Sequence, residues 1–192
     1  MTKIGLCITG SFCTFKSILT AVDDLIQNGY DVTPIFSFNV STLDTRFFKQ
    51  ADFERIIVEK TGKQPIKTIV DAEPLGTRNA LDLMLVAPCT GNTLAKIAHG
   101  ITDTPVTLAV KAHLRNNRPV VLSVSSNDAL GANAKNIGML LNTRNIYFVP
   151  FGQDEPIKKP NSLVADVSQI VPTIESALDG KQIQPTLRTF HV

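Results

Sequence analysis

The chain of 192 residues contains no tryptophan, few aromatic side chains and only three histidines and three cysteines. Because aromatic residues make up just 6% of the chain, we do not expect the stacking surfaces that bind single-stranded nucleic acid. The net charge is +2 and no run of lysine or arginine occurs, which excludes any electrostatic sign of a nucleic-acid or membrane-surface partner. No segment has the apolar length of a transmembrane helix, and the apolar N-terminus is too short for a secretory signal. We therefore expect a cytoplasmic protein.

The cysteines, Cys7, Cys13 and Cys89, have neither zinc-finger spacing nor an even number. Histidines and carboxylates do not cluster with them, so we expect no metal site. Cys13 and Cys89 stand near predicted helix starts, where the helix dipole would lower a thiol pKa, but no histidine is placed in the sequence as a base. Buried or free thiols in a reducing compartment are the simpler interpretation.

Apolar segments alternate with helical patterns along the chain, which is typical of an α/β fold. The predicted strands are residues 3–9, 31–37, 81–87, 119–124 and 146–149, with a weaker candidate at 66–70. Helical spacing fills the intervals and predicts a last helix over residues 163–178. We predict one doubly wound, Rossmann-like or flavodoxin-like domain over residues 1–180, with a parallel sheet in three layers. Residues 151–162 are predicted to form a loop or flap, and residues 181–192 a C-terminal tail that is loose or docked on a neighbour.

The most informative stretch is residues 81–97, where a run dense in leucine and valine stops at Pro88. Thr90, Asn92 and Thr93 follow, and then a helical pattern begins. This order predicts a buried strand, a turn and a helix start, whose free backbone N–H groups and positive dipole end favour an anion, above all a phosphate. An ordinary capped helix without a ligand explains the same residues, and here it competes with anion binding on nearly equal terms.

Three further loops follow predicted strands at the same edge of the sheet, where doubly wound proteins bind ligands. After the first strand, Gly10 allows close approach of a ligand, and Ser11 caps a helix or donates to a phosphate. Taken alone, this loop is better explained as a helix cap, because the dinucleotide and P-loop fingerprints are both missing. Ser37 follows the second strand and suits a ribityl or ribose hydroxyl. Ser123 and Ser125 offer hydroxyl groups at the end of the fourth predicted strand.

Together these loops resemble the flavoprotein family of homo-oligomeric FMN-binding proteins. That family includes phosphopantothenoylcysteine decarboxylase, lantibiotic-type cysteine decarboxylases and flavin prenyltransferases. Its signature P-x-S-x-N-T-L-x-K-I stands here as PCTGNTLAKI over residues 88–97, and the resemblance spans nearly the whole chain. It implies a homo-oligomer that binds FMN. The cofactor contacts that it implies are Gly10, Ser11, Phe12, Ser37, Thr90, Asn92, Thr93, Ser123 and Ser125.

Two departures separate the chain from these relatives. By count, Pro74 stands where the cysteine decarboxylases carry a catalytic histidine, and Ser125 stands where the prenyltransferases carry an arginine. Longer matched strings, over residues 72–76, 126–131 and 145–154, resemble one branch of the family. That branch implies oxidation of a small dicarboxylate together with a second protein chain, which carries a nicotinamide-dinucleotide domain.

A dianionic substrate requires cations near the flavin. Arg46 is the first candidate and Lys16 the second, although a solvated surface charge explains Lys16 equally well. Asn127, kept from a P-A-M-N substrate motif, is a candidate to orient the substrate or to contact the flavin. Three functions remain open: an oxidoreductase-type enzyme subunit, a regulatory or scaffold subunit with a vestigial flavin site, and a stand-alone decarboxylase or prenyltransferase. The two departures disfavour the last.

Overall fold

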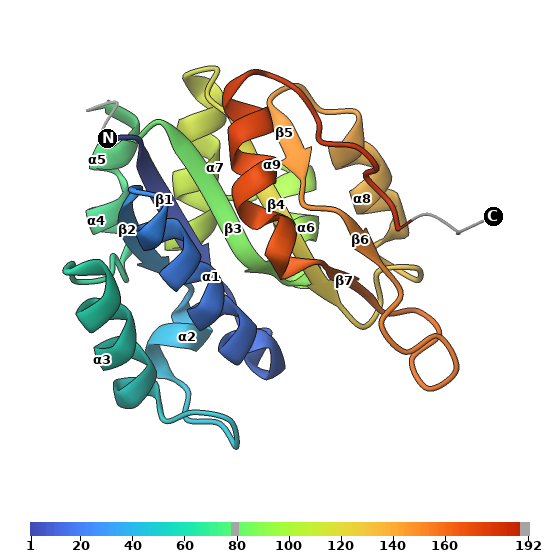
Figure 1. Cartoon of the computed structure of the whole chain (residues 1–192), viewed down its shortest axis with the longest axis horizontal. Coiled ribbons are helices and arrows are strands. Elements are labelled where there is room, and N and C mark those ends of the chain that lie inside the picture. Colours follow the sequence, from blue (N-terminus) through green and yellow to red (C-terminus); the bar gives the residue numbers. More distant parts are fainter. Residues whose placement is uncertain (78–80, 189–192) are drawn as a thin grey trace.

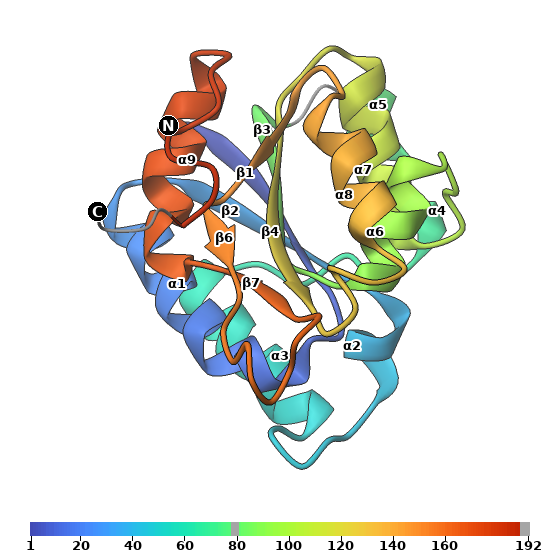
Figure 2. The same ribbon diagram turned by 90° about the vertical axis from the view of Figure 1, so that its right-hand side faces the viewer.

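A seven-stranded sheet runs through the part of the chain that the computed structural model describes, residues 1–77 and 81–188, with helices on both faces (Figures 1 and 2). Its parallel strands are β1 (Lys3–Ile8), β2 (Asp31–Phe36), β3 (Leu83–Cys89), β4 (Val120–Ser126) and β5 (Ile146–Phe148). They pair in the order β2-β1-β3-β4-β5, which is the flavodoxin-like, doubly wound order. The predicted fold class is confirmed.

Helices cover the two faces of the sheet as separate layers (Figure 2). One layer contains α1 (Phe15–Gln27), α3 (Gln50–Thr61) and α9 (Ile170–Leu178), and the other contains α6 (Gly91–Ala98), α7 (Pro105–Arg115) and α8 (Ala134–Leu141). The short helices are α2 (Phe38–Thr42), α4 (Ile69–Ala72) and α5 (Pro74–Thr77), with 3-10 turns η1 (Phe12–Thr14) and η2 (Val167–Gln169). Among these residues no helix is both long and apolar enough to cross a bilayer.

The core lies between the sheet and these layers because the strands are apolar on both sides. All seven residues of β3 are buried, as expected for a central parallel strand. On α1, Phe15, Ile18 and Val22 recur at helical spacing and face the sheet. The ring of Phe15 stacks on that of Phe53 from α3, with 4.1 Å between their centroids.

The sheet departs from the prediction at its last two strands, which are antiparallel. β7 (Leu163–Ala165) pairs with the carboxyl half of β4, and β6 (Phe151–Gly152) pairs with β7. The predicted helix over residues 163–178 is therefore wrong at its start, and the predicted loop at 151–162 begins with a strand. Residues 153–162 form the projecting loop at the lower right of Figure 1.

The predicted strand at residues 66–70 is wrong. Only Ile66 pairs, in an isolated bridge with Ile35. The chain then turns into α4, because the Thr68 hydroxyl accepts a hydrogen bond from the amide of Asp71 and caps that helix.

The described part of the predicted tail lies against its own chain. The side-chain amide of Gln182 bonds the backbone N–H and C=O of Phe148, at 2.7 Å each. Further on, the amide of Phe151 donates to Thr186 O, and the amide of Arg188 donates to Phe151 O, both at 3.1 Å. Residues 189–192 of that prediction lie outside the described residues.

Candidate functional site

A polar cavity of about 290 Å³ lies where β1, β2 and β3 end. Its lining consists of Thr9, Gly10, Ser37, Phe38, Asn39, Thr90, Asn92, Thr93, Lys96 and Thr104. Ligands of doubly wound proteins bind outside the carboxyl ends of the strands at the switch point, which here lies between β1 and β3. Five predicted cofactor residues, from three loops far apart in sequence, meet in this one cavity.

Thr9 joins the ends of β1 and β3 beneath the cavity. Its buried hydroxyl donates to the carbonyl of Pro88 at 2.6 Å and accepts from the amide of Thr90 at 3.1 Å. The register of β3 on β4 shifts between Val86 and Cys89, so the backbone around Pro88 leaves the regular ladder. The Thr9 hydroxyl supplies the partners that the shifted backbone would otherwise lack.

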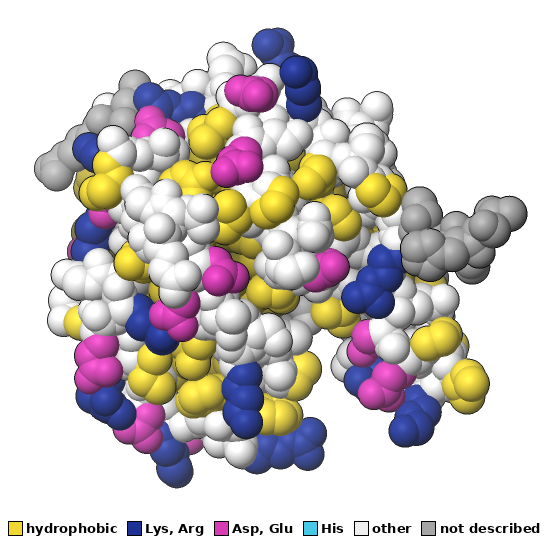
Figure 3. All heavy atoms as spheres, in the orientation of Figure 1, with side chains coloured by type: hydrophobic (Ala, Val, Ile, Leu, Met, Phe, Trp, Pro, Cys, Tyr) yellow, Lys and Arg dark blue, Asp and Glu magenta, His cyan; other side chains and the backbone are white. Residues whose placement is uncertain are grey.

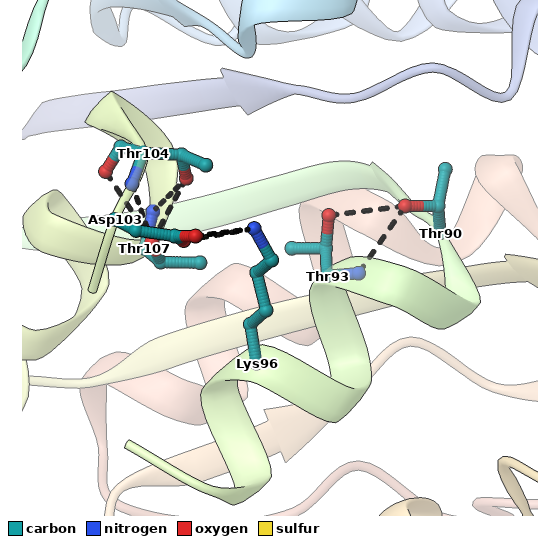
Figure 4. A network of polar contacts seen from close by, with 6 residues as sticks. All are labelled: Thr90, Thr93, Lys96, Asp103, Thr104 and Thr107. Carbon is teal, nitrogen blue, oxygen red and sulfur yellow. Dashed lines mark hydrogen bonds and ion pairs between the residues drawn. The ribbon is translucent and has the colours of Figure 1, made fainter. Parts of the chain in front are cut away.

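The start of α6 forms one wall and is capped by Thr90. The Thr90 hydroxyl accepts from the amide of Thr93 at 3.4 Å and lies 3.0 Å from its hydroxyl (Figure 4). The amides of Gly91 and Asn92, in the first turn, have no carbonyl within the helix to bond. The cap predicted from the sequence is thus present, and the amides that an anion would use remain beside it.

Gly91 is glycine because the loop after β4 packs directly against it. A Cβ atom there would lie 2.5 Å from Ser126 Oγ, 2.6 Å from Asn133 Nδ2 and 2.7 Å from Asp128 Oδ1. These side chains bond one another, since Asp128 accepts from Ser126 at 2.5 Å and from Asn133 at 2.8 Å. This network fixes the loop after β4 against the cavity wall.

An ion pair links the lining residue Lys96, on α6, to Asp103, just before the cap of α7 (Figure 4). Lys96 Nζ lies 2.8 and 2.9 Å from the two carboxylate oxygens of Asp103, and this hydrogen bonding is the main cause that lowers the pKa of the Asp103 carboxyl. The next residue, Thr104, caps α7 in a reciprocal pair with Thr107. Among the lining residues of the described chain, Lys96 is the single cation.

The other predicted cofactor residues lie nearby but outside the lining. Ser11 Oγ is 2.7 Å from Ser125 Oγ, which ties the loop after β1 to the end of β4. The ring of Phe12 packs on that of Phe15, with 5.2 Å between centroids. Ser123 is buried within β4.

The predicted substrate residues are exposed and do not line the cavity. The guanidinium of Arg46 lies over the ring of Phe47, 4.8 Å from its centroid. Lys16 stands on the solvent side of α1, and Asn127 in the turn after β4. Pro74 begins α5, which packs against α7, and it too is outside the lining.

Two of the three thiols are fully buried. Burial raises the pKa of both Cys7 and Cys89 far above the ordinary range, and Cys7 Sγ lies 3.4 Å from Met84 Sδ. The interpretation of Cys89 as a buried thiol is confirmed, because desolvation of the thiolate outweighs the dipole of α6. Cys13 is exposed. In the described part of the chain no group of three or more metal-binding side chains occurs.

A larger groove, of about 600 Å³, lies between α8, β6 and residues 187–188. Its polar side chains are those of Gln153 and Arg188, and the rest of its lining is apolar or glycine. This groove lies beside β6 at one edge of the sheet, whereas doubly wound proteins bind ligands at the switch point. We therefore assign the candidate site to the smaller cavity at the switch point. On the face seen in Figure 3, positive and negative side chains are interspersed rather than gathered in one patch.

Five lining residues were not assigned to the site from the sequence: Thr9, Phe38, Asn39, Lys96 and Thr104. Thr9, Phe38 and Asn39 belong to loops that the sequence already singled out. Lys96 could have been predicted from the sequence, because it follows Thr93 by three positions and so lies on the same helix face. No pattern in the sequence predicts that Thr104, which lies beyond the loop after α6, lines the cavity.

A polar cavity at the switch point of this sheet defines a class, the nucleotide- and flavin-binding α/β proteins. The family model described as Flavoprotein matches residues 1–178, and the chain belongs to that family. It is 48% identical to the B subunit of dipicolinate synthase from Bacillus subtilis (strain 168) over 185 residues, which covers 96% of this chain and 92% of the relative.

Solved structures give the same picture. The B subunit of dipicolinate synthase from Bacillus halodurans superposes with a TM-score of 0.90 at 44% identity, covering 99% of this chain and 97% of that one. AnUbiX, solved in complex with FMN and dimethylallyl pyrophosphate, superposes with a TM-score of 0.68 at 15% identity, covering 100% and 98%. The latter likeness concerns the fold alone.

Proposed function

We propose that this chain serves as the B subunit of a dipicolinate synthase. With the A subunit of dipicolinate synthase it would form dipicolinic acid (pyridine-2,6-dicarboxylate) from an intermediate of the dihydrodipicolinate pathway during sporulation. The observation that carries the proposal is 48% identity over nearly the full length of both chains. The family match, over residues 1–178, includes every loop around the cavity as well as β6 and β7.

FMN is the proposed cofactor, and the residues present fit part of it. Hydroxyl groups, free amides of α6 and one ammonium group suit a phosphate and a polyhydroxyl chain. A cavity of about 290 Å³ is at the small end of ligand sites, so the flavin ring would extend beyond it. We propose a homo-oligomer, in which a second copy covers that ring.

Aromatisation of a dihydropyridine ring removes a hydride and a proton. When bound, FMN supplies an acceptor for hydride equivalents, and we expect the A subunit to carry a nicotinamide dinucleotide. In this chain, Ser37 and Asn92 would hold and orient the cofactor. Thr9 would keep the strand ends in place beneath it. Burial of Cys7 and Cys89 as neutral thiols keeps both away from the chemistry.

The test is production of the chain alone and together with the A subunit. We expect the purified chain to carry or take up FMN, and dipicolinic acid to form only when both proteins are present. Asn92→Ala should weaken flavin binding and lower dipicolinate formation together. Thr20→Val, which alters an exposed hydroxyl on α1, is the matched control. A chain that takes up no flavin and does not change the rate of its partner would refute the proposal.

A scaffold role is the second candidate, favoured by the two departures from the relatives. Pro74 has no ionisable group, and Ser125 is bonded to Ser11 rather than presented to the cavity. If this role is correct, Asn92→Ala would abolish flavin binding and leave dipicolinate formation by the complex unchanged. A stand-alone decarboxylase or prenyltransferase is not supported by either position.

A further inference from the structure

Lys96 stands between two groups of hydroxyl side chains, with its ammonium directed at Asp103 (Figure 4). Thr90 and Thr93 lie on one side of it and Thr104 on the other, and all three line the cavity with it. The two partners of the ion pair differ in exposure. The Lys96 side chain is 22% exposed and that of Asp103 is 58% exposed.

We propose that Lys96 is the cation that binds the phosphate monoester of FMN, and that Asp103 holds Lys96 in position until the phosphate enters. This assignment rests on the proposed function. Arg46 and Lys16 lie outside the lining, which leaves Lys96 as the cation that the described lining offers to an anion. An exposed carboxylate returns to water at little cost, whereas the phosphate brings a larger charge to the same ammonium.

The neighbouring groups select a phosphate rather than a flavin ring. The pair formed by the Thr90 and Thr93 hydroxyls uses one of their two protons, and the other remains for a ligand. The amides of Gly91 and Asn92 lie in the first turn of the same helix, and Lys96 follows on the same face as Thr93. Hydroxyl, amide and ammonium donors in one wall match the oxygens of a phosphate.

The test compares FMN with riboflavin, which differs from it only by the phosphate. The full-length chain is titrated with each flavin, and binding is followed by flavin fluorescence and calorimetry. We expect FMN to bind more tightly than riboflavin. Lys96→Gln should reduce that preference at least about tenfold and leave riboflavin affinity unchanged. Asp103→Asn should keep or increase FMN affinity. Lys111→Gln, which removes an equal charge from the exposed side of α7, is the control and should match the unaltered chain.

Each other outcome is decisive. A Lys96→Gln variant that keeps the preference for FMN refutes the assignment while the proposed function stands. A variant that loses both flavins equally assigns Lys96 a structural role instead. If Lys96→Gln binds FMN normally and only its KM for the dicarboxylate rises, Lys96 binds the substrate rather than FMN. If the unaltered chain binds neither flavin, the proposed cofactor fails and this assignment fails with it, and the effect of the chain on the rate of the A subunit then decides whether the proposed function stands.

Discussion

Replacing Gly91 with alanine should destabilise the protein, although alanine is the better helix former. The new Cβ atom would lie 2.5 to 2.7 Å from Ser126, Asp128 and Asn133, closer than real Cβ contacts allow. All three atoms are polar and belong to one hydrogen-bonded network. The loop after β4 must therefore move away from α6, and the network must open.

The size of the effect follows from these contacts. The two hydrogen bonds to Asp128, which is exposed, contribute about 0.5 to 1.5 kcal/mol each, and overpacking costs roughly 1 to 3 kcal/mol. Alanine in a helix gains back about 1 kcal/mol over glycine. We expect the free energy of unfolding of Gly91→Ala to fall by about 1 to 5 kcal/mol.

Urea unfolding followed by circular dichroism measures this change, and Gly138→Ala is the matched control. Gly138 lies within α8, and a Cβ atom there would meet nothing within 4 Å. The control should therefore gain up to about 1 kcal/mol. If Gly91→Ala is as stable as Gly138→Ala, the close packing of the loop against α6 is not what requires glycine.

Three further predictions concern the cavity and the buried histidine. Gly10→Ala should change the free energy of unfolding by no more than about 0.5 kcal/mol, because its Cβ atom would lie 3.4 Å from the nearest atom. The same variant should bind FMN more weakly in a titration. Unaltered FMN affinity would place Gly10 outside the site. Thr9→Val should lower the free energy of unfolding in urea by about 1 to 3 kcal/mol, since the carbonyl of Pro88 and the amide of Thr90 lose their hydrogen-bond partner. An unchanged free energy of unfolding would show that the Thr9 hydroxyl does not stabilise these two groups. Burial lowers the pKa of His113 from 6.5 to about 4, so the unfolded chain binds the proton more readily. Stability should be full above pH 6.5 and fall by about 3 kcal/mol towards pH 4, a loss that His113→Gln should lack and that a pH series of unfolding curves would detect.

The parallel part of the sheet was predictable because its strands are long and apolar on both faces. β1, β3 and β4 each bury most of their residues, so they appear in the sequence as continuous apolar runs. β6 and β7 are only two and three residues long. Leu163–Ala165 merges with the apolar pattern of α9, and its strand pairing depends on β4, which local sequence does not reveal.

The site was predictable as far as loops alone define it. Ser37, Thr90 and Asn92 follow strands directly, so the parallel order of the sheet brings them together. Thr104 arrives at the cavity only through the packing of α7 beside α6. Ser125 was placed at the site by its position after a strand, but in the structure it pairs with β7 and bonds Ser11.

The backbone bonds of residues 186–188 to Phe151 have a consequence for solubility. Without them, β6 would present unpaired N–H and C=O groups and a ring that is now 2% exposed, which together form a template for strands of other molecules. Residues 186–188 therefore protect this edge of the sheet from pairing with other molecules. We expect a chain shortened after residue 180 to lose this protection and aggregate, while the polar cavity, on the other side of β4, stays intact.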